Sequence, residues 1–166
     1  RILGAMAAWA AIVVAVVGIY GYRNDILQSR LVGQFNPARP VQTENGEVVL
    51  TAGEGGHFYA YGEVNGEAVY FMLDTGASDI VLSPDDAERV GFSPDTLIYS
   101  RSYATANGRV DGARVMLRSL SIGDIELNEI PASVNRAEMQ HSLLGMTFLQ
   151  RLSGFRVEGD QLTLVP

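Results

Sequence analysis

The sequence contains no cysteine, only two histidines and no run of basic residues. Without cysteine the chain forms no disulfide, thiolate metal site or cysteine nucleophile. The twelve Lys and Arg residues are scattered and the formal net charge is −7, which disfavours nucleic acid because phosphate recognition needs a basic stripe. His57 and His141 belong to no His-Glu-x-x-His pattern. We therefore expect no metal site and no cofactor, and we place both histidines in surface or turn positions.

Charged residues are also missing from the first part of the chain. No residue from Ile2 to Tyr22 is charged, and about twenty such residues cross a bilayer as a helix. The alternatives are a cleaved signal peptide, which needs a shorter apolar core and an Ala-x-Ala-like site, and a buried core helix. We expect a single-span transmembrane anchor over residues 1–23, in contact with the lipid bilayer. The flanking charges do not determine its orientation.

The rest of the chain divides into a linker and one domain. Residues 24–46 mix charges with Asn-Pro, Arg-Pro and Asn-Gly pairs and have no hydrophobic period, which predicts a linker. Residues 47–166 suffice for one modest domain but not for two similar lobes. The glycine-rich segment 51–56 lacks a following Gly-Lys-Ser/Thr and precedes a strand, so we interpret it as a turn or joint.

The patterns within this domain predict an all-β fold with one or two short helices. Asn65-Gly66 joins two strands in a type I′ hairpin, and Ser83 followed by Pro84 begins a helix that ends near Gly91. The expected strands are 57–64, 67–73, 80–82, 96–104, 109–117, 119–127 (itself a hairpin), 130–134, 155–158 and 161–165, and a second helix is expected over 146–152.

A carboxylate stands at a tight turn between two apolar runs, in the stretch Phe71 to Leu82. Because an unpaired buried charge is costly, Asp74 must either accept hydrogen bonds from its neighbours or stay protonated. Gly76 permits close backbone approach, and the hydroxyls of Thr75 and Ser78 both donate and accept. The alternative is an ordinary turn in which the aspartate bonds its own backbone.

Two motifs in this order resemble a known family. Asp74-Thr75-Gly76-Ala77-Ser78 after an apolar strand resembles the active-site turn of aspartic proteases. Leu143-Leu144-Gly145, followed by a short helix, resembles the hydrophobic-hydrophobic-Gly segment of retropepsins. The similarity covers about residues 47–166 and is closest to bacterial membrane-anchored single-domain proteases of the retropepsin-like type. It implies a closed β-barrel and a protease domain that lies in the periplasm.

The same resemblance implies a substrate flap between the two motifs. The flap is Tyr103 to Val115, and its crest is Ala104, Thr105, Ala106, Asn107 and Gly108, small residues that allow a hairpin to lie close over a peptide. The family's glycine-rich crest is only partly reproduced, so the residue at the tip is not defined, and Tyr103 is a candidate aromatic wall. A plain surface hairpin is the alternative interpretation.

The sequence has one Asp-Thr-Gly, whereas peptide hydrolysis by carboxylates needs two acids that share a proton about a water. The resemblance therefore implies a homodimer in which the Asp74 carboxylates of two chains meet, with Thr75 bracing the turns and Ser78 orienting the outer carboxylate oxygen. The expected activity is that of an aspartic endopeptidase on polypeptide substrates. The alternative is a non-catalytic, tethered peptide-binding or scaffolding β-barrel module.

Overall fold

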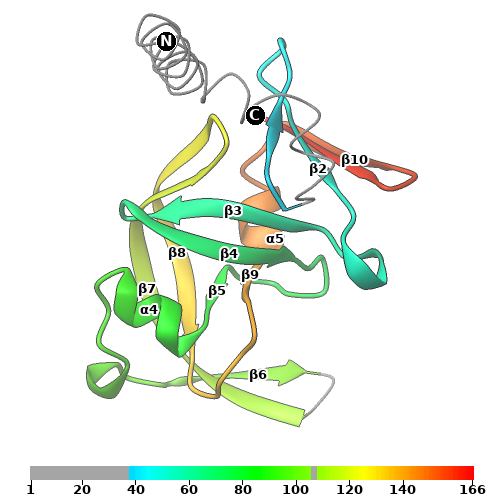
Figure 1. The fold of residues 1–166 in the computed structure, drawn as a ribbon. Helices are drawn as coiled ribbons and strands as arrows, with labels where there is room; N and C mark the ends of the chain where they lie inside the picture. Colours follow the sequence, from blue (N-terminus) through cyan, green and yellow to red (C-terminus); the bar gives the residue numbers. More distant parts are fainter. Residues whose placement is uncertain (1–37, 106–107) are drawn as a thin grey trace, which may run out of the picture.

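The computed structural model describes residues 38–105 and 108–166 of the chain, drawn in colour in Figure 1. In these two ranges no helix has the length and apolar character needed to cross a bilayer. The predicted anchor over residues 1–23 lies outside the described residues, as do Ala106 and Asn107 of the predicted flap crest. These predictions stay predictions.

The described residues form two β-sheets and a few short helices, which confirms the predicted all-β class. The strands are β1 Val41–Gln42, β2 Val48–Thr51, β3 Tyr59–Val64, β4 Glu67–Leu73, β5 Val81–Leu82, β6 Arg101–Thr105, β7 Gly108–Ile122, β8 Ile125–Asn135, β9 Ser142–Leu144, β10 Gly154–Glu158 and β11 Gln161–Val165. The α-helices are α4 Pro84–Arg89 and α5 Met146–Leu149, and the 3-10 turns are η1 Glu54–Gly56 and η2 Pro94–Thr96.

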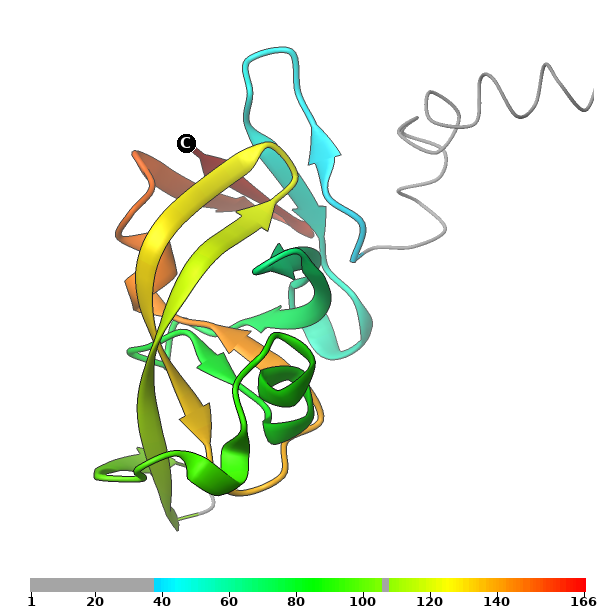
Figure 2. The same cartoon turned by 90° about the vertical axis from the view of Figure 1, so that its left-hand side faces the viewer.

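The larger sheet closes on itself. Its strand order is β3-β4-β9-β5-β8-β7-β6, and β3 also pairs with β7 through Glu63↔Ser121 and Val64↔Leu120. Fully buried apolar side chains such as Phe71, Leu117 and Phe148 fill the enclosed space. The curved wall of β7 and β8 is visible in Figure 2. The closure agrees with the expected barrel, and β6 is an edge strand that pairs with the first residues of β7.

A smaller sheet, in the order β1-β2-β11-β10, packs at one end of the molecule (Figure 1). Its first strand, β1, pairs with β2 through Val41↔Val49. The paired part of the chain thus begins inside the segment that we predicted as a linker. The guanidinium of Arg156 on β10 forms two 3.1 Å bonds to the Glu47 carboxylate, and this pairing lowers the pKa of Glu47. Strand β10 is an edge of this sheet.

Two long strands replace four predicted pieces. Strands β7 and β8 keep one register from Gly112↔Asn135 to Ile122↔Ile125, and the pair Arg118↔Glu129 is missing from it. The predicted break near residue 118 is therefore a local interruption within two long strands. Glu129 has a φ of 49°, and the amides of Arg118 and Ser119 donate to Asn65 Oδ1 at 2.9 and 3.3 Å. The expected strand over 96–104 begins only at Arg101, since η2 starts at Pro94, whose fixed φ favours a turn.

The predicted helix after Ser83 is present as α4. The Ser83 side chain accepts a hydrogen bond from the Asp86 amide, as the capping pattern predicted. The Asp86 side chain is 12% exposed, and it accepts a hydrogen bond from Ser142 on β9 and pairs with Arg89. A buried carboxylate that is satisfied in this way fixes the helix to the strand that supports the candidate site.

Candidate active site

The turn after β4 holds its carboxylate by main-chain hydrogen bonds. The Gly76 amide donates to Asp74 Oδ1 at 2.8 Å, and the Ala77 amide donates to the Asp74 carbonyl at 3.1 Å. The Asp74 amide donates to the Leu144 carbonyl at 3.1 Å. Asp74 is half-buried and Thr75 is exposed. The local turn that we considered as an alternative is therefore present, and it presents a carboxylate at the surface of the barrel.

Ser78 supports the turn through its backbone. Its carbonyl accepts hydrogen bonds from both the amide and the hydroxyl of Thr147, each at 2.9 Å. In the described part of the chain, the Asp74 carboxylate takes its hydrogen bond from Gly76 and none from the Ser78 hydroxyl. Ser78 thus ties the turn to helix α5.

The second motif lies directly beneath the first. Strand β9 pairs with β4 in parallel, so that Leu143 lies beside Met72 and Leu144 beside Leu73. A Cβ added to Gly145 would come within 2.4 Å of the Ala77 carbonyl oxygen and 2.3 Å of that of Asp79. Only glycine fits there, because both contacts are with rigid backbone. The Leu-Leu-Gly segment is therefore the support of the acidic turn.

A network that we did not predict joins the turn to the flap strand. The Tyr103 hydroxyl donates to Asp79 Oδ2 at 2.7 Å and lies 2.6 Å from Ser133 Oγ, which itself donates to Asp79 Oδ2 at 3.0 Å. Thr147 Oγ1 lies 3.4 Å from Asp79 Oδ1. Desolvation of the Tyr103 hydroxyl, reinforced by the Asp79 carboxylate, raises the pKa of this tyrosine. Tyr103 is therefore tethered to the turn through Asp79.

The one sequence signal for this network is that Asp79 is a second acid in the same turn. Its partners come from β6 and β8, which are distant in sequence, so no local pattern could identify them. The ring of Tyr103 packs against β7, where a Cβ added to Gly112 would lie 2.6 Å from Tyr103 Cε2. The predicted aromatic wall is thus anchored at the base of the hairpin.

The described remainder of the predicted crest, Ala104, Thr105 and Gly108, belongs to the paired ends of β6 and β7. The backbones of Ala104 and Thr105 pair with Arg109 and Gly108. In Figure 1 this hairpin projects at the end of the molecule opposite the smaller sheet. The structure thus confirms a projecting hairpin at the predicted place.

Asp74 and Thr75 line a hollow of about 260 Å³ together with apolar residues. Phe155 and Val157 of β10 border it and are 41% and 56% exposed. The remaining lining residues are Gly56, His57, Phe58, Leu73, Leu149 and Leu162. The acidic turn therefore adjoins an exposed apolar sheet edge.

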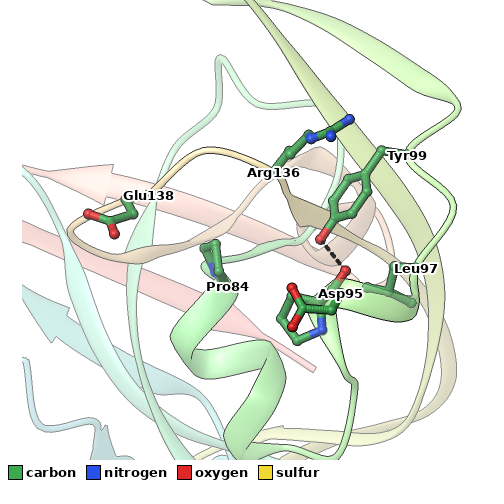
Figure 3. Close-up of a pocket in the computed structure, with 7 residues that line it drawn as sticks. Pro84, Asp95, Leu97, Tyr99, Arg136 and Glu138 are labelled. Carbon is green, nitrogen blue, oxygen red and sulfur yellow. Dashed lines mark hydrogen bonds between the residues drawn. The ribbon is translucent and has the colours of Figure 1, made fainter.

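A larger hollow of about 540 Å³ lies elsewhere, between η2, the start of α4 and the segment after β8 (Figure 3). The Arg136 guanidinium lies 5.4 Å from the Tyr99 ring centre, and the Tyr99 hydroxyl donates to the Pro94 carbonyl at 3.1 Å. Asp95 and Glu138 also line this hollow, and Asp74 does not. We take the smaller hollow as the candidate site, since it contains the carboxylate of the Asp-Thr-Gly turn, Asp74. Among the described residues, no group of His, Cys, Asp or Glu could hold a metal ion.

Comparison with known proteins agrees with this geometry. The family described as "gag-polyprotein putative aspartyl protease" matches residues 60–151, which is more than half of the chain. Uncharacterized protein RP867 of Rickettsia prowazekii (strain Madrid E) is 38% identical over 161 residues, covering 96% of this chain and 69% of that protein.

Solved structures show the same fold. A retropepsin-like aspartic protease from Rickettsia conorii superposes with a TM-score of 0.65 at 39% identity, over 72% of this chain and 90% of that chain. The EIAV protease in complex with the inhibitor HBY-793 superposes with a TM-score of 0.53 at 17% identity, over 66% of this chain and 100% of that chain, which shows the fold alone. The motif turn, its Leu-Leu-Gly support and these similarities together show that the chain belongs to the retropepsin-like aspartic protease family.

Proposed function

We propose that the chain is a membrane-anchored aspartic endopeptidase whose active form is a homodimer, with one Asp74 carboxylate from each protomer. The observation that carries the proposal is the Asp74 turn. Its carboxylate is held by the Gly76 amide, is supported from below by Gly145 and opens into a hollow beside an exposed sheet edge. A pure binding module has no need for an acid held in this way.

The dimer is supported by what surrounds Asp74. Each chain carries one Asp-Thr-Gly, and two acids are needed to hold one proton between them. Phe155 and Val157 expose apolar surface next to the turn, and Thr75 is exposed beside it. A second copy related by a two-fold axis would bury this surface and bring the two turns together.

The chemistry in such a dimer follows from a shared proton. The ionised carboxylate accepts a proton from water as the water oxygen bonds to the peptide carbonyl carbon, and the protonated carboxylate donates a hydrogen bond to the carbonyl oxygen. The carbon–nitrogen bond then breaks as the nitrogen takes up a proton. The products are a carboxylic acid and an amine, so water is the only co-reactant.

The substrate of this reaction is an extended polypeptide that lies under the β6–β7 hairpin. A peptide in this position gains main-chain hydrogen bonds as an added strand does. Tyr103 fixes the base of the hairpin to the turn through Asp79, so the hairpin and the carboxylates keep a constant spacing. This spacing defines the room for the substrate backbone.

Anchoring supports the pairing of two chains. The uncharged run over residues 2–22 is the basis for proposing a single span, with the protease domain in the periplasm. Two chains held in one membrane meet at a raised effective concentration, which favours a dimer whose interface is small.

The test compares the full-length chain with its Asp74→Asn variant in the cleavage of unfolded protein, from mildly acidic to neutral pH. Asp160→Asn, in the exposed β10–β11 turn, is the matched control. We expect cleavage by the parent chain and by the control, and loss of cleavage in Asp74→Asn, because both acids of the dimer become amides that cannot accept a proton from water.

Equal cleavage by the parent and Asp74→Asn would eliminate the peptidase and favour the alternative binding module. Sedimentation of the same samples tests the dimer separately, and an active species that sediments as a monomer would contradict the two-chain site.

A further inference from the structure

Three tyrosines and a histidine form a cluster on the outer face of the β3–β4 hairpin. The rings of Tyr59 and Tyr70 are stacked, with centres 5.5 Å apart and planes 8° apart. The Tyr61 ring lies 4.7 Å from that of Tyr70, and His141 stands edge-on, 5.5 Å from Tyr59 and 5.1 Å from Tyr70. We name these four residues the aromatic platform. It joins two strands to the segment that leads into β9.

The aromatic platform is open to a ligand. Tyr61 is 48% exposed and the other three side chains are half-buried. Within the residues that the structure describes, the three tyrosine hydroxyls have no hydrogen-bond partner in the protein. Aromatic side chains of this kind offer a large, rigid contact surface at low entropic cost.

The aromatic platform lies along the strand that leads into the Asp74 turn. Tyr70 and Met72 alternate with the buried Val69 and Phe71 along β4, so both point away from the core, and Asp74 follows directly after the strand. Met72 pairs with Tyr59 on one side and with Leu143 on the other. Four residues of strand separate Tyr70 from Asp74, which is roughly 13 Å. A polypeptide held at Asp74 therefore reaches the platform with residues beyond those that flank the cut.

A negative charge beside the aromatic platform favours a cationic side chain in the ligand. Glu63 follows Tyr61 by two residues on the same face of β3 and is exposed, in a chain with a formal net charge of −7. The faces of tyrosine rings attract cations, and arginine stacks on them better than the more strongly hydrated lysine. An arginine that lies on the exposed Tyr61 ring would direct its guanidinium toward the Glu63 carboxylate.

We propose that the aromatic platform is a distal subsite that binds an arginine side chain of the polypeptide substrate. This inference rests on the proposed peptidase function for its ligand, but its first test is a binding measurement that needs no cleavage.

The first test uses the full-length Asp74→Asn chain and a fluorescein-labelled decapeptide of alternating Ser and Val with Arg at both ends, followed by fluorescence anisotropy. The comparison peptide has Gln in place of both Arg residues. We expect the Arg peptide to bind more tightly, and Tyr61→Leu and Glu63→Gln each to weaken it two- to fivefold, as expected for an exposed cation–π contact. Ile98→Ala and Asp160→Asn, which change exposed side chains elsewhere, should leave it unchanged.

Equal binding of the Arg and Gln peptides, or no detectable binding of the Arg peptide, would overturn the subsite. So would a loss of binding in the two control variants that equals the loss in Tyr61→Leu. Circular dichroism of each variant verifies that the fold is retained, and both Tyr61 and Glu63 are exposed enough for substitution.

The second test digests a mixture of proteome-derived peptides with the parent chain and identifies the cut sites by mass spectrometry. Arg should be enriched several residues from the cut with the parent, and this enrichment should vanish with Tyr61→Leu. Cleavage that depends on Asp74 but shows no such enrichment would reject the subsite and leave the peptidase in place. Tighter binding of the Arg peptide by a chain that cleaves nothing would reject the peptidase and leave the subsite in place.

Discussion

The hydroxyl of Tyr103 offers a sharp test of how the flap strand is held. Tyr103→Phe keeps the ring against β7 and removes only the oxygen that lies 2.7 Å from Asp79 Oδ2 and 2.6 Å from Ser133 Oγ. The Asp79 carboxylate keeps a hydrogen-bond donor in this variant, because Ser133 still donates to it at 3.0 Å. A hydrogen bond to a charged group contributes about 1.5 to 3 kcal/mol, so we expect the free energy of unfolding to fall by about 2 kcal/mol.

The measurement is urea unfolding followed by circular dichroism, at one fixed protein concentration because association would add to stability. Tyr99→Phe is the matched control, since its hydroxyl donates to the neutral Pro94 carbonyl at 3.1 Å. We expect the control to lose about 1 kcal/mol or less. In a peptidase assay Tyr103→Phe should raise KM more than it lowers kcat, because the Asp74 turn is intact while the hairpin base is looser.

A double-mutant cycle with Ser133→Ala separates the network from the ring. If Tyr103 acts through Asp79 and Ser133, the loss of unfolding free energy in the double variant should differ from the sum of the two single losses by at least about 0.5 kcal/mol. Strict additivity, or a loss in Tyr103→Phe no greater than in Tyr99→Phe, would refute the idea that the hydroxyl ties the flap strand to the turn.

Two further predictions concern the support of the turn and its pH dependence. Gly145→Ala should destabilise the fold by several kcal/mol, because the added Cβ meets two backbone oxygens. Gly154→Ala is the control and should be nearly neutral, because the space around its Cβ is open. Thermal unfolding of both variants distinguishes them, and equal unfolding midpoints would contradict the close contact. Burial raises the pKa of Tyr103 and of Tyr70 above 10.0, so the folded state binds more protons than the unfolded state in alkaline solution. Stability should therefore be full below about pH 10 and fall as the pH rises through the folded values, less steeply in Tyr103→Phe; urea titrations from pH 8 to 11 that show no fall would refute this.

Several features of the fold were predictable because short segments encode them. Asn65 and Gly66 have φ values of 53° and 91°, as the type I′ turn requires, and Ser83 caps α4 as its pattern predicted. The two motifs at Asp74 and Gly145 also occur where their sequence signals placed them. Turn dipeptides, caps and a motif act over a few residues, so a sequence displays them directly.

Strand length was harder to predict. The single span of β7 and its pairing with β8 extend through Leu117↔Ile130 and Ser119↔Asn128, where we expected separate elements. Strand continuity depends on which neighbours supply hydrogen bonds, and that depends on register over the whole sheet. The same reason explains why β1 joined the sheet from a segment without a hydrophobic period.

The sequence by itself determined that a carboxylate stands at a glycine-containing turn after a buried strand, and that a Leu-Leu-Gly unit follows far downstream. Only the tertiary structure decided that Gly145 lies under Ala77 and Asp79, and that Tyr103 binds Asp79 rather than forming a free wall. The physical reason is range: a turn or cap is satisfied by atoms nearby in the chain, whereas Asp79 finds its partners on β6 and β8 only after the barrel has closed.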